Sequence, residues 1–381
     1  MIQIDKLLQV VISKNASDLH LHVGRPPMVR LHGRLKRLDT ETLTPEDTAG
    51  LMRSITPDRY QQEVEEVGSA DFGFGFQDKA RFRVAVFKQK GCIGLTMRLI
   101  PSRLMSLQEI GLPPIVESLL SRTRGLFLVT GPTGCGKTTT LAAMVNYINE
   151  HFDRHIITVE EPIEYYHNHK KSIINQREIG TDVPTYEEAV RRALRADPDV
   201  MLIGEMRDLQ TMEAAIRAAE TGHLVFSTLH TTGAAGTVTR IVDAFPVGQK
   251  EMIRIQLAGS LMAVLSQTLV PRVDMPGRIA AYEFMVINAA AQNLIRKNES
   301  FRLESYIQTG GKWGMQLLDD SLWDLYSRGV ISPEDLLEHA QRREELEHKL
   351  AETSEGREVL RRLGGPTSEA DAKTFQKSRG S

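Results

Sequence analysis

A glycine-rich run in the first half of the chain has the residue types and spacing of a phosphate-binding loop. It reads GPTGCGKT and matches the P-loop pattern at every fixed position, between an apolar stretch at residues 126–129 and a helix-like run at residues 141–145. Glycines let backbone N–H groups curl around phosphate oxygens, and a helix N-terminus adds a favourable dipole. We expect Lys137 to reach the β- and γ-phosphates of ATP and Thr138 to coordinate Mg²⁺. The predicted nucleotide-binding residues of the loop are Gly131, Pro132, Thr133, Gly134, Cys135, Gly136, Lys137, Thr138 and Thr139.

Two acidic segments could supply the carboxylates that ATP hydrolysis needs. The apolar stretch at residues 200–203 leads to Glu205, at the place where P-loop enzymes carry an acid that supports Mg²⁺. The apolar stretch at residues 156–159 is followed by Glu160, Glu161 and Glu164, and a hydrolase needs a carboxylate that orients and deprotonates water. A solvated acidic turn is the alternative interpretation of this second segment.

Two histidines, His223 and His230, bracket a further apolar stretch. We expect His230 just beyond the carboxyl end of a strand, which is the edge where open α/β sheets bind ligands. A purely structural role is the alternative for each histidine. A metal site is not expected, because no further His/Cys cluster accompanies the pair.

Arginines recur on two alternating segments near the N-terminus. In residues 81–86 the apolar side chains share one face, so Arg81 and Arg83 face the other way. Arg98 likewise lies opposite the apolar side chains of residues 93–99. Adjacent antiparallel strands would gather these arginines on one polar face, and P-loop enzymes often receive a cationic partner for the γ-phosphate. Arg83 and Arg98 are therefore candidate catalytic residues, with a solvated sheet face as the alternative.

These residues must be positioned by two kinds of sheet. Alternating strands in residues 1–100 predict a small α/β domain with an antiparallel sheet, and residues 101–114 read as a linker. From residue 115 to 345, short apolar strands alternate with helices, which is typical of a parallel sheet covered by helices. The tail, residues 346–381, is charged and is expected to be weakly ordered.

The composition narrows the class of protein. The 381 residues include 47 basic and 49 acidic side chains, a balance that argues against a dedicated nucleic-acid binder. No apolar run is long enough to span a bilayer and no secretory signal is visible. Two cysteines exclude a disulfide scaffold and a four-cysteine zinc site on this chain. We expect a cytoplasmic protein that docks on a membrane machine without inserting into the bilayer.

Several segments together resemble the secretion ATPase superfamily, and within it the pilus-retraction ATPases of the PilT type. They read GPTGCGKTTT, ITVEEPIEYYH, DPDVMLIGEMRD, AAETGHLVFSTLHT and YIQTGGKWGMQLLD, and the likeness covers roughly residues 1–340. The resemblance implies a PAS-like N-terminal α/β domain and a C-terminal RecA-like P-loop ATPase domain. It implies ATP and Mg²⁺ as ligands, a homo-hexamer, and a position at the cytoplasmic face of the inner membrane on a pilus platform protein.

The resemblance also implies roles for individual residues. Glu164 matches the family's catalytic base, Glu205 its second acidic element, and His223 and His230 its γ-phosphate-sensing histidines. Arg83 and Arg98 match arginines that complete the ATP site. Two further positions depart from the family pattern. They are Gln292 and Lys297, in a helix linked to retraction more than to hydrolysis.

The predicted function is Mg²⁺-dependent ATP hydrolysis that drives retraction of a type IV pilus and so supports twitching motility. The first alternative is a nucleotide-binding accessory subunit that assembles with a paralogous ATPase and regulates it. The second alternative, a nucleic-acid translocase, is disfavoured by the neutral charge and by the lack of an aromatic–basic face.

Overall fold

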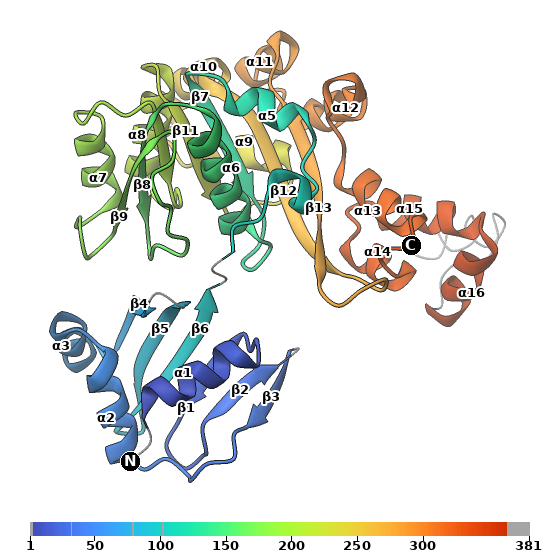
Figure 1. The fold of residues 1–381 in the computed structure, drawn as a ribbon. Helices are drawn as coiled ribbons and strands as arrows, with labels where there is room; N and C mark the ends of the chain where they lie inside the picture. The colour runs from blue at the N-terminus through green and yellow to red at the C-terminus, as the bar shows by residue number, and fades with distance from the viewer. Residues whose placement is uncertain (1–2, 32, 78–79, 101–102, 364–381) are drawn as a thin grey trace. The chain divides into compact units, whose positions relative to one another are not determined.

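The computed structural model describes residues 3–31, 33–77, 80–100 and 103–363. The chain divides into two compact units, which we call the N-terminal unit and the P-loop unit (Figure 1). The N-terminal unit contains Met1–Leu104 together with two later segments, Glu160–Asn168 and Gln176–Asp182. The P-loop unit contains Met105–Val159, His169–Asn175 and Val183–Ser381. The division therefore differs from the predicted contiguous domains, because the acidic segment around Glu164 belongs to the N-terminal unit.

An antiparallel sheet with strand order β3-β2-β1-β6-β5-β4 forms the centre of the N-terminal unit. One face of this sheet and the apolar stripes of its helices enclose the core. The strands and helices are β1 (Asp18–Leu21), β2 (Met28–Leu31), β3 (Arg34–Arg37), β4 (Ser69–Phe76), β5 (Ala80–Gln89), β6 (Cys92–Ile100), α1 (Ile4–Ser13), α2 (Pro45–Ile55) and α3 (Asp58–Glu66).

The local sequence explains most of these elements. Val84 and Val86 of β5 are buried while their neighbours are partly exposed, as a period of two requires. Helix α2 begins with a capping box between Thr44 and Asp47, which satisfies two backbone groups at the helix start. Strands β3 and β4 were not predicted. All four residues of β3 are exposed, so this edge strand has no apolar alternation to reveal it.

A seven-stranded sheet with order β13-β12-β7-β11-β10-β8-β9 forms the centre of the P-loop unit (Figure 1). The pairs β12–β7, β7–β11, β11–β10 and β10–β8 are parallel, and β13 joins antiparallel to β12. Every residue of β7, β10 and β11 is buried, as expected for strands covered on both faces. The predicted α/β class, with an antiparallel N-terminal sheet, is confirmed. The second sheet, predicted to be parallel, also carries the antiparallel strand β13. The strands are β7 (Gly125–Thr130), β8 (His155–Glu160), β9 (Ile173–Glu178), β10 (Val200–Ile203), β11 (Leu224–Leu229), β12 (Leu261–Pro271) and β13 (Arg278–Val286).

The helices of the P-loop unit follow the strands and then continue beyond the sheet. They are α4 (Leu107–Ile110), α5 (Ile115–Leu120), α6 (Lys137–His151), α7 (Tyr186–Ala193), α8 (Leu209–Glu220), α9 (Ala234–Asp243), η1 (Val247–Gln249), α10 (Lys250–Ser260), α11 (Ala289–Arg296), η2 (Ser300–Arg302), α12 (Leu303–Gln308), η3 (Gly311–Trp313), α13 (Leu318–Ser327), α14 (Pro333–His339), α15 (Arg343–Ala351) and α16 (Ser354–Leu363). Across the described ranges, no helix is both long enough and apolar enough to cross a membrane.

Two predicted segments differ from the structure. The predicted linker, residues 101–114, contains α4, whose Leu107 and Ile110 join the core of the P-loop unit. The segment from residue 346, expected to be weakly ordered, is helical as far as Leu363. Leu346, Leu350 and Leu360 pack in a small apolar cluster there, and these few leucines were hidden among many charged residues. Residues 364–381 lie outside the described residues.

Candidate active site

The glycine-rich run forms a tight loop between β7 and α6. Gly131, Gly134 and Gly136 have φ values of +139°, +81° and +93°, which favour glycine because a side chain would strain the backbone. Gly136 is the N-cap of α6, so the loop delivers the N-terminus of a 15-residue helix. The first N–H groups of a helix have no partner within the helix. The loop therefore provides the donors and the helix dipole that a phosphate needs.

The side chain of Gln267, on β12, holds the loop and the start of α6 by two hydrogen bonds. Its Nε2 donates a hydrogen bond to the Cys135 carbonyl at 2.6 Å, and its Oε1 accepts one from Thr140 Oγ1 at 3.0 Å. A Cβ atom on Gly131 would lie 2.3 Å from the Gln267 carbonyl oxygen, so only glycine fits this close approach. Burial raises the pKa of the Cys135 thiol, which disfavours the thiolate form that a nucleophilic cysteine needs.

The ammonium group of Lys137 is held by its own loop. It donates hydrogen bonds to the carbonyl oxygens of Gly131 at 2.8 Å and Pro132 at 3.1 Å. Burial lowers the pKa of Lys137, while the nearby Cys135 and Glu205 side chains act in the opposite direction. The group is therefore a partly desolvated cation at the mouth of the loop, where a phosphate would gain most from it.

Glu205 and His230 link the loop to the neighbouring strands. His230 follows β11, as predicted, and its Nε2 lies 3.1 Å from Glu205 Oε1. Its Nδ1 lies 3.5 Å from Thr133 Oγ1 of the loop. The other carboxylate oxygen of Glu205 pairs with Arg207 Nε at 2.9 Å. The predicted residues Thr133, Glu205 and His230 thus form one connected polar chain.

The structure does not bring His223 to this chain. His223 precedes β11, and its carbonyl oxygen accepts a hydrogen bond from the Gly125 N–H at the start of β7. The P-loop follows the opposite end of β7, and the six residues of β7 span roughly 20 Å at the rise of a strand. His223 therefore lies away from the P-loop of its own chain, and its predicted role at the nucleotide stays a prediction. His223 and His230 lie at opposite ends of β11, so they lie at opposite ends of the parallel strands of the sheet.

Arg83 and Arg98 meet on the polar face of the N-terminal sheet, as predicted. They are direct cross-strand partners between β5 and β6. Arg98 Nε donates to Asp18 Oδ1 at 2.9 Å, whereas Arg83 has no hydrogen bond or ion pair to the described part of the chain. Burial opposes ionisation of Asp18, but hydrogen bonds from Ser17 and Arg98 hold its pKa below the ordinary value. Two cations placed directly opposite each other repel, and one carboxylate compensates only in part.

Glu164 also lies in the N-terminal unit and is half-buried between two buried neighbours, Ile163 and Tyr165. No hydrogen bond or ion pair with a described residue engages its carboxylate. An unpaired carboxylate keeps the lone pairs that a general base needs.

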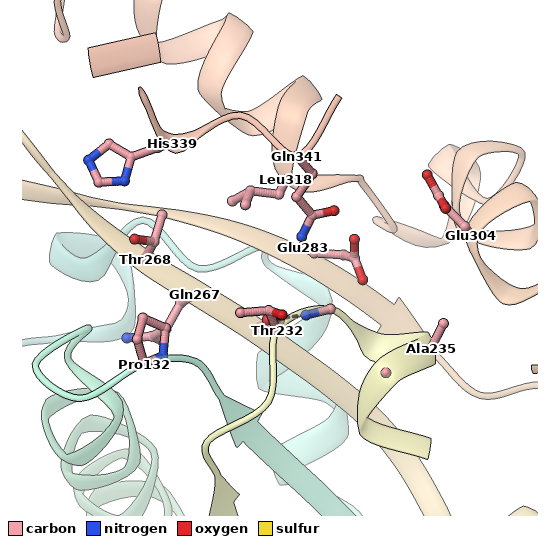
Figure 2. Close-up of a pocket in the computed structure, with 13 residues that line it drawn as sticks. Pro132, Thr232, Ala235, Gln267, Thr268, Glu283, Glu304, Leu318, His339 and Gln341 are labelled. Atoms are coloured by element: carbon pink, nitrogen blue, oxygen red, sulfur yellow. Dashed lines mark hydrogen bonds between the residues drawn. The ribbon is translucent and has the colours of Figure 1, made fainter. Parts of the chain in front are cut away.

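A pocket of about 460 Å³ adjoins the P-loop at Pro132 (Figure 2). Its walls come from the start of α9 and from the C-terminal region, including His339 at the end of α14 and Gln341 between α14 and α15. Glu283, on β13, lies within it and is only 4% exposed. Burial raises the pKa of Glu283, against a hydrogen bond that its Oε1 accepts from the Ala234 N–H at 2.6 Å. This carboxyl group caps the start of α9 beside the loop.

Sequence reasoning missed several residues that shape the site. Gln267 and Asp18 lie on strands remote in sequence from the groups that they hold, so no local spacing reveals them. Arg207 is two residues from Glu205 and could have been found from that proximity. Among the residues with described positions, no cluster of three or more His, Cys, Asp or Glu side chains suits a metal ion.

Comparisons with known proteins agree with this architecture. The family model "Type II/IV secretion system protein" matches residues 1–321. The chain is 46% identical over 338 residues to the type IV pilus retraction ATPase PilT of Pseudomonas aeruginosa, covering 89% of this chain and 98% of that protein. It is 47% identical over 320 residues to a twitching motility protein of Neisseria gonorrhoeae, covering 84% of this chain and 86% of that protein.

A solved structure gives the same result. The crystal structure of the pilus retraction motor PilT with bound ADP superimposes with a TM-score of 0.85 at 46% identity, and the match covers 91% of this chain and all of that one. These matches extend over both sheets and over the P-loop. The chain belongs to the type II/IV secretion system protein family and is a homologue of the PilT retraction ATPase.

Proposed function

We propose that this protein is a Mg²⁺-dependent ATPase that drives retraction of a type IV pilus and so supports twitching motility. The observation that carries the ATPase activity is the connected chain from Thr133 through His230 to Glu205, whose charge acts on the partly desolvated Lys137. Retraction is inferred from the relatives, which include a pilus retraction ATPase and a twitching motility protein. The ADP bound in the related motor supports an adenine nucleotide as the ligand.

The loop residues Gly131–Thr139 would hold the phosphates of ATP. Lys137 exchanges its two carbonyl partners for phosphate oxygens, so its charge is available where negative charge builds during transfer. The Thr138 hydroxyl and the Glu205 carboxylate are oxygen ligands of the kind that Mg²⁺ prefers, and they would hold this ion directly or through water. The ion supplies neutralisation of the β- and γ-phosphate charge. His230 is placed to register the γ-phosphate, because it contacts both the loop and Glu205.

The N-terminal unit would supply the remaining groups. We assign Glu164 as the base that takes a proton from the attacking water, since its carboxylate is unpaired among the described residues. Arg83 and Arg98 offer two adjacent cations with one compensating carboxylate, a surplus that a phosphate would neutralise. Whether these arginines serve their own chain or a neighbour follows from the assembly, for which we propose a homo-hexamer. Its docking partner would be a pilus platform protein at the cytoplasmic face of the inner membrane, with no insertion into the bilayer.

Replacement of Glu164 by glutamine tests the proposal. Glutamine keeps the shape and loses the basic oxygen, so we expect ADP affinity within about threefold of wild type and turnover lowered at least 100-fold. Cells that carry this variant as the sole copy should accumulate pili and lose surface motility. Full turnover by Glu164→Gln together with an inactive Glu205→Gln variant would reverse the roles of the two acids. Absence of turnover by the wild-type chain would refute the motor proposal.

The accessory-subunit alternative rests on one specific region. Helix α11 carries the two departures from the family pattern, with Gln292 half-buried and Lys297 exposed at the helix C-terminus. Lysine is favourable there because it complements the helix dipole, so these changes are compatible with a stable fold. Rapid turnover by the purified chain alone would favour a motor, whereas turnover only after addition of a paralogous ATPase would favour the accessory role.

Stimulation of turnover by single-stranded DNA would revive the translocase alternative.

A further inference from the structure

The guanidinium group of Arg81 binds the backbone immediately before Glu164. Arg81 lies on β5, and its side chain is 12% exposed. Its Nε donates a hydrogen bond to the Ile163 carbonyl oxygen at 2.9 Å. The guanidinium group also covers the ring of Tyr166, with 3.8 Å between its central carbon and the ring centre. One side chain of the N-terminal sheet therefore contacts residues on both sides of Glu164.

Glu178 closes the arrangement from the other side. Its Oε2 accepts a hydrogen bond from the Ile163 N–H at 3.0 Å and pairs with Arg81 Nη2 at 3.3 Å. Arg81, Glu178 and the Ile163 peptide thus form a closed ring of hydrogen bonds in which both backbone groups of Ile163 are engaged. Glu178 Oε1 in turn accepts a hydrogen bond from Thr181 Oγ1 at 3.2 Å, so its carboxylate is fixed at both oxygens.

A second side chain fixes the backbone after Glu164. Gln176 Nε2 donates to the Tyr165 carbonyl oxygen at 2.8 Å, and Gln176 Oε1 accepts from the His167 N–H at 2.8 Å. The peptide groups before and after Glu164 are therefore held by other side chains, while the Glu164 carboxylate itself is not. A segment outside any helix or strand is otherwise free to move.

We propose that Arg81, paired with Glu178, is a positioning residue that orients the Glu164 carboxylate to take a proton from the attacking water. This inference rests on the proposed function, because it assigns to Glu164 the role of general base. Arg81 contacts the backbone of the base-bearing segment, which separates its role from that of Arg83 and Arg98 on the same sheet. Orientation errors of about 1 Å at a catalytic group cost on the order of 100-fold in rate.

Arginine is needed here for its shape as well as for its charge. The planar guanidinium group reaches the Ile163 carbonyl oxygen through Nε and Glu178 through Nη2 at the same time, which a lysine ammonium on a flexible stem cannot reproduce with the same geometry. Removal of only one partner leaves the other charge buried and unpaired, which destabilises the fold. The test must therefore separate positioning from stability.

Arg154 provides a matched control in the P-loop unit. It is also a half-buried arginine that binds backbone carbonyl oxygens, at 3.3 Å to Leu120, 2.6 Å to Ser121 and 2.7 Å to Arg122. It contacts no residue assigned to catalysis. The full chain is compared as wild type, Arg81→Met, Arg81→Lys, Glu178→Gln and Arg154→Met. The measurements are kcat and KM for ATP, the Kd for ADP, the Tm, and hydrogen exchange of residues 160–167.

We expect Arg81→Met to lower kcat 10- to 100-fold with the Kd for ADP changed less than threefold. Arg81→Lys should recover much of the Tm but little of kcat, because charge returns without the planar geometry. Exchange of residues 160–167 should accelerate in Arg81→Met and not in Arg154→Met, which loses Tm but keeps kcat within threefold. If Arg81→Met is too unstable to purify, Glu178→Gln gives the same comparison, since glutamine keeps the acceptor for Ile163 and loses the charge.

Two results would overturn the inference. One is an equal kcat in Arg81→Met and Arg154→Met at equal loss of Tm. The other is unchanged exchange of residues 160–167 in Arg81→Met. A wild-type chain without turnover would refute the proposed function separately, because the exchange measurement still reports whether Arg81 holds the segment.

Discussion

The P-loop and the arginine face of the N-terminal sheet handle positive charge in opposite ways. Lys137 sits in a loop of consecutive residues and rests on two carbonyl oxygens of that loop. Arg83 and Arg98 come from two different strands, and only Arg98 has a carboxylate partner, Asp18, on a third strand. The P-loop is a site made by local sequence, whereas the arginine face exists only when three strands pair in register. Removal of either set of cations should lower turnover, but only the arginine face depends on the pairing of three strands to bring its cations together.

The largest expected effect comes from removal of the loop's cation. We expect Lys137→Ala to lower kcat at least about 10³-fold, because the ammonium group neutralises charge that develops on the phosphates. Steady-state phosphate release at saturating ATP measures this effect. Lys170→Ala is the control, since Lys170 pairs with Glu150 on the surface and should leave kcat unchanged. Turnover of Lys137→Ala within a few-fold of wild type would place the charge stabilisation elsewhere.

The arginine face should give the next largest effect. We expect Arg83→Ala and Arg98→Ala to lower kcat about 10²- to 10³-fold while ADP still binds the P-loop. Arg83→Ala should leave the Tm unchanged or raise it slightly, because it removes repulsion against Arg98. Arg37→Ala on the exposed edge strand β3 is the control. If both variants turn over ATP at the wild-type rate, the arginine face is only a solvated surface.

Loss of Gln267 should affect the P-loop, because this side chain holds the loop and the start of α6 by hydrogen bonds. Gln267→Leu leaves the Cys135 carbonyl and the Thr140 hydroxyl without their partner, which should cost about 2–3 kcal/mol of unfolding free energy. The Kd for ADP should rise as the loop loses its geometry. Thermal unfolding and ADP titration measure both effects, with Gln256→Leu, a change to a surface hydrogen bond, as the control. An unchanged Kd would show that the glycines alone fix the loop.

The smallest expected effect concerns Glu283 and pH. Burial raises the pKa of this carboxyl group above its ordinary value of 4.5, so the folded state holds the proton more tightly than the unfolded state does. Wild type therefore loses stability as the pH rises from about 4.5 through the folded-state pKa, by up to about 1.4 kcal/mol per pH unit. Glu283→Gln keeps the acceptor for Ala234 and should be more stable than wild type at pH 7 by a few degrees in Tm. Parallel Tm curves for the two proteins between pH 5 and 8 would contradict this prediction.

Sequence patterns predicted the P-loop, the two kinds of sheet and the shared face of Arg83 and Arg98, because each depends on spacing within one segment or on neighbouring strands. They did not predict Gln267 or Asp18, whose partners lie about 130 and 80 residues away along the chain. Helix α16 was not predicted, because sparse leucines among charged residues resemble a solvated tail. The family resemblance predicted a nucleotide role for His223, but it carries no information on distance, and β11 separates His223 from the end of the sheet that holds the P-loop of the same chain.

The hydrogen bond between Thr140 and Gln267 limits how the sequence of this protein can change during evolution. Only glycine fits at position 131 beside the Gln267 carbonyl oxygen, and the Gln267 side chain hydrogen-bonds to the Cys135 carbonyl and the Thr140 hydroxyl. Only Thr140 and Gln267 contact each other through both side chains, so replacement of either one alone leaves the other without this hydrogen-bond partner. We therefore expect substitutions at positions 140 and 267 to occur together in related sequences. These two positions should co-vary although they lie more than 120 residues apart along the chain.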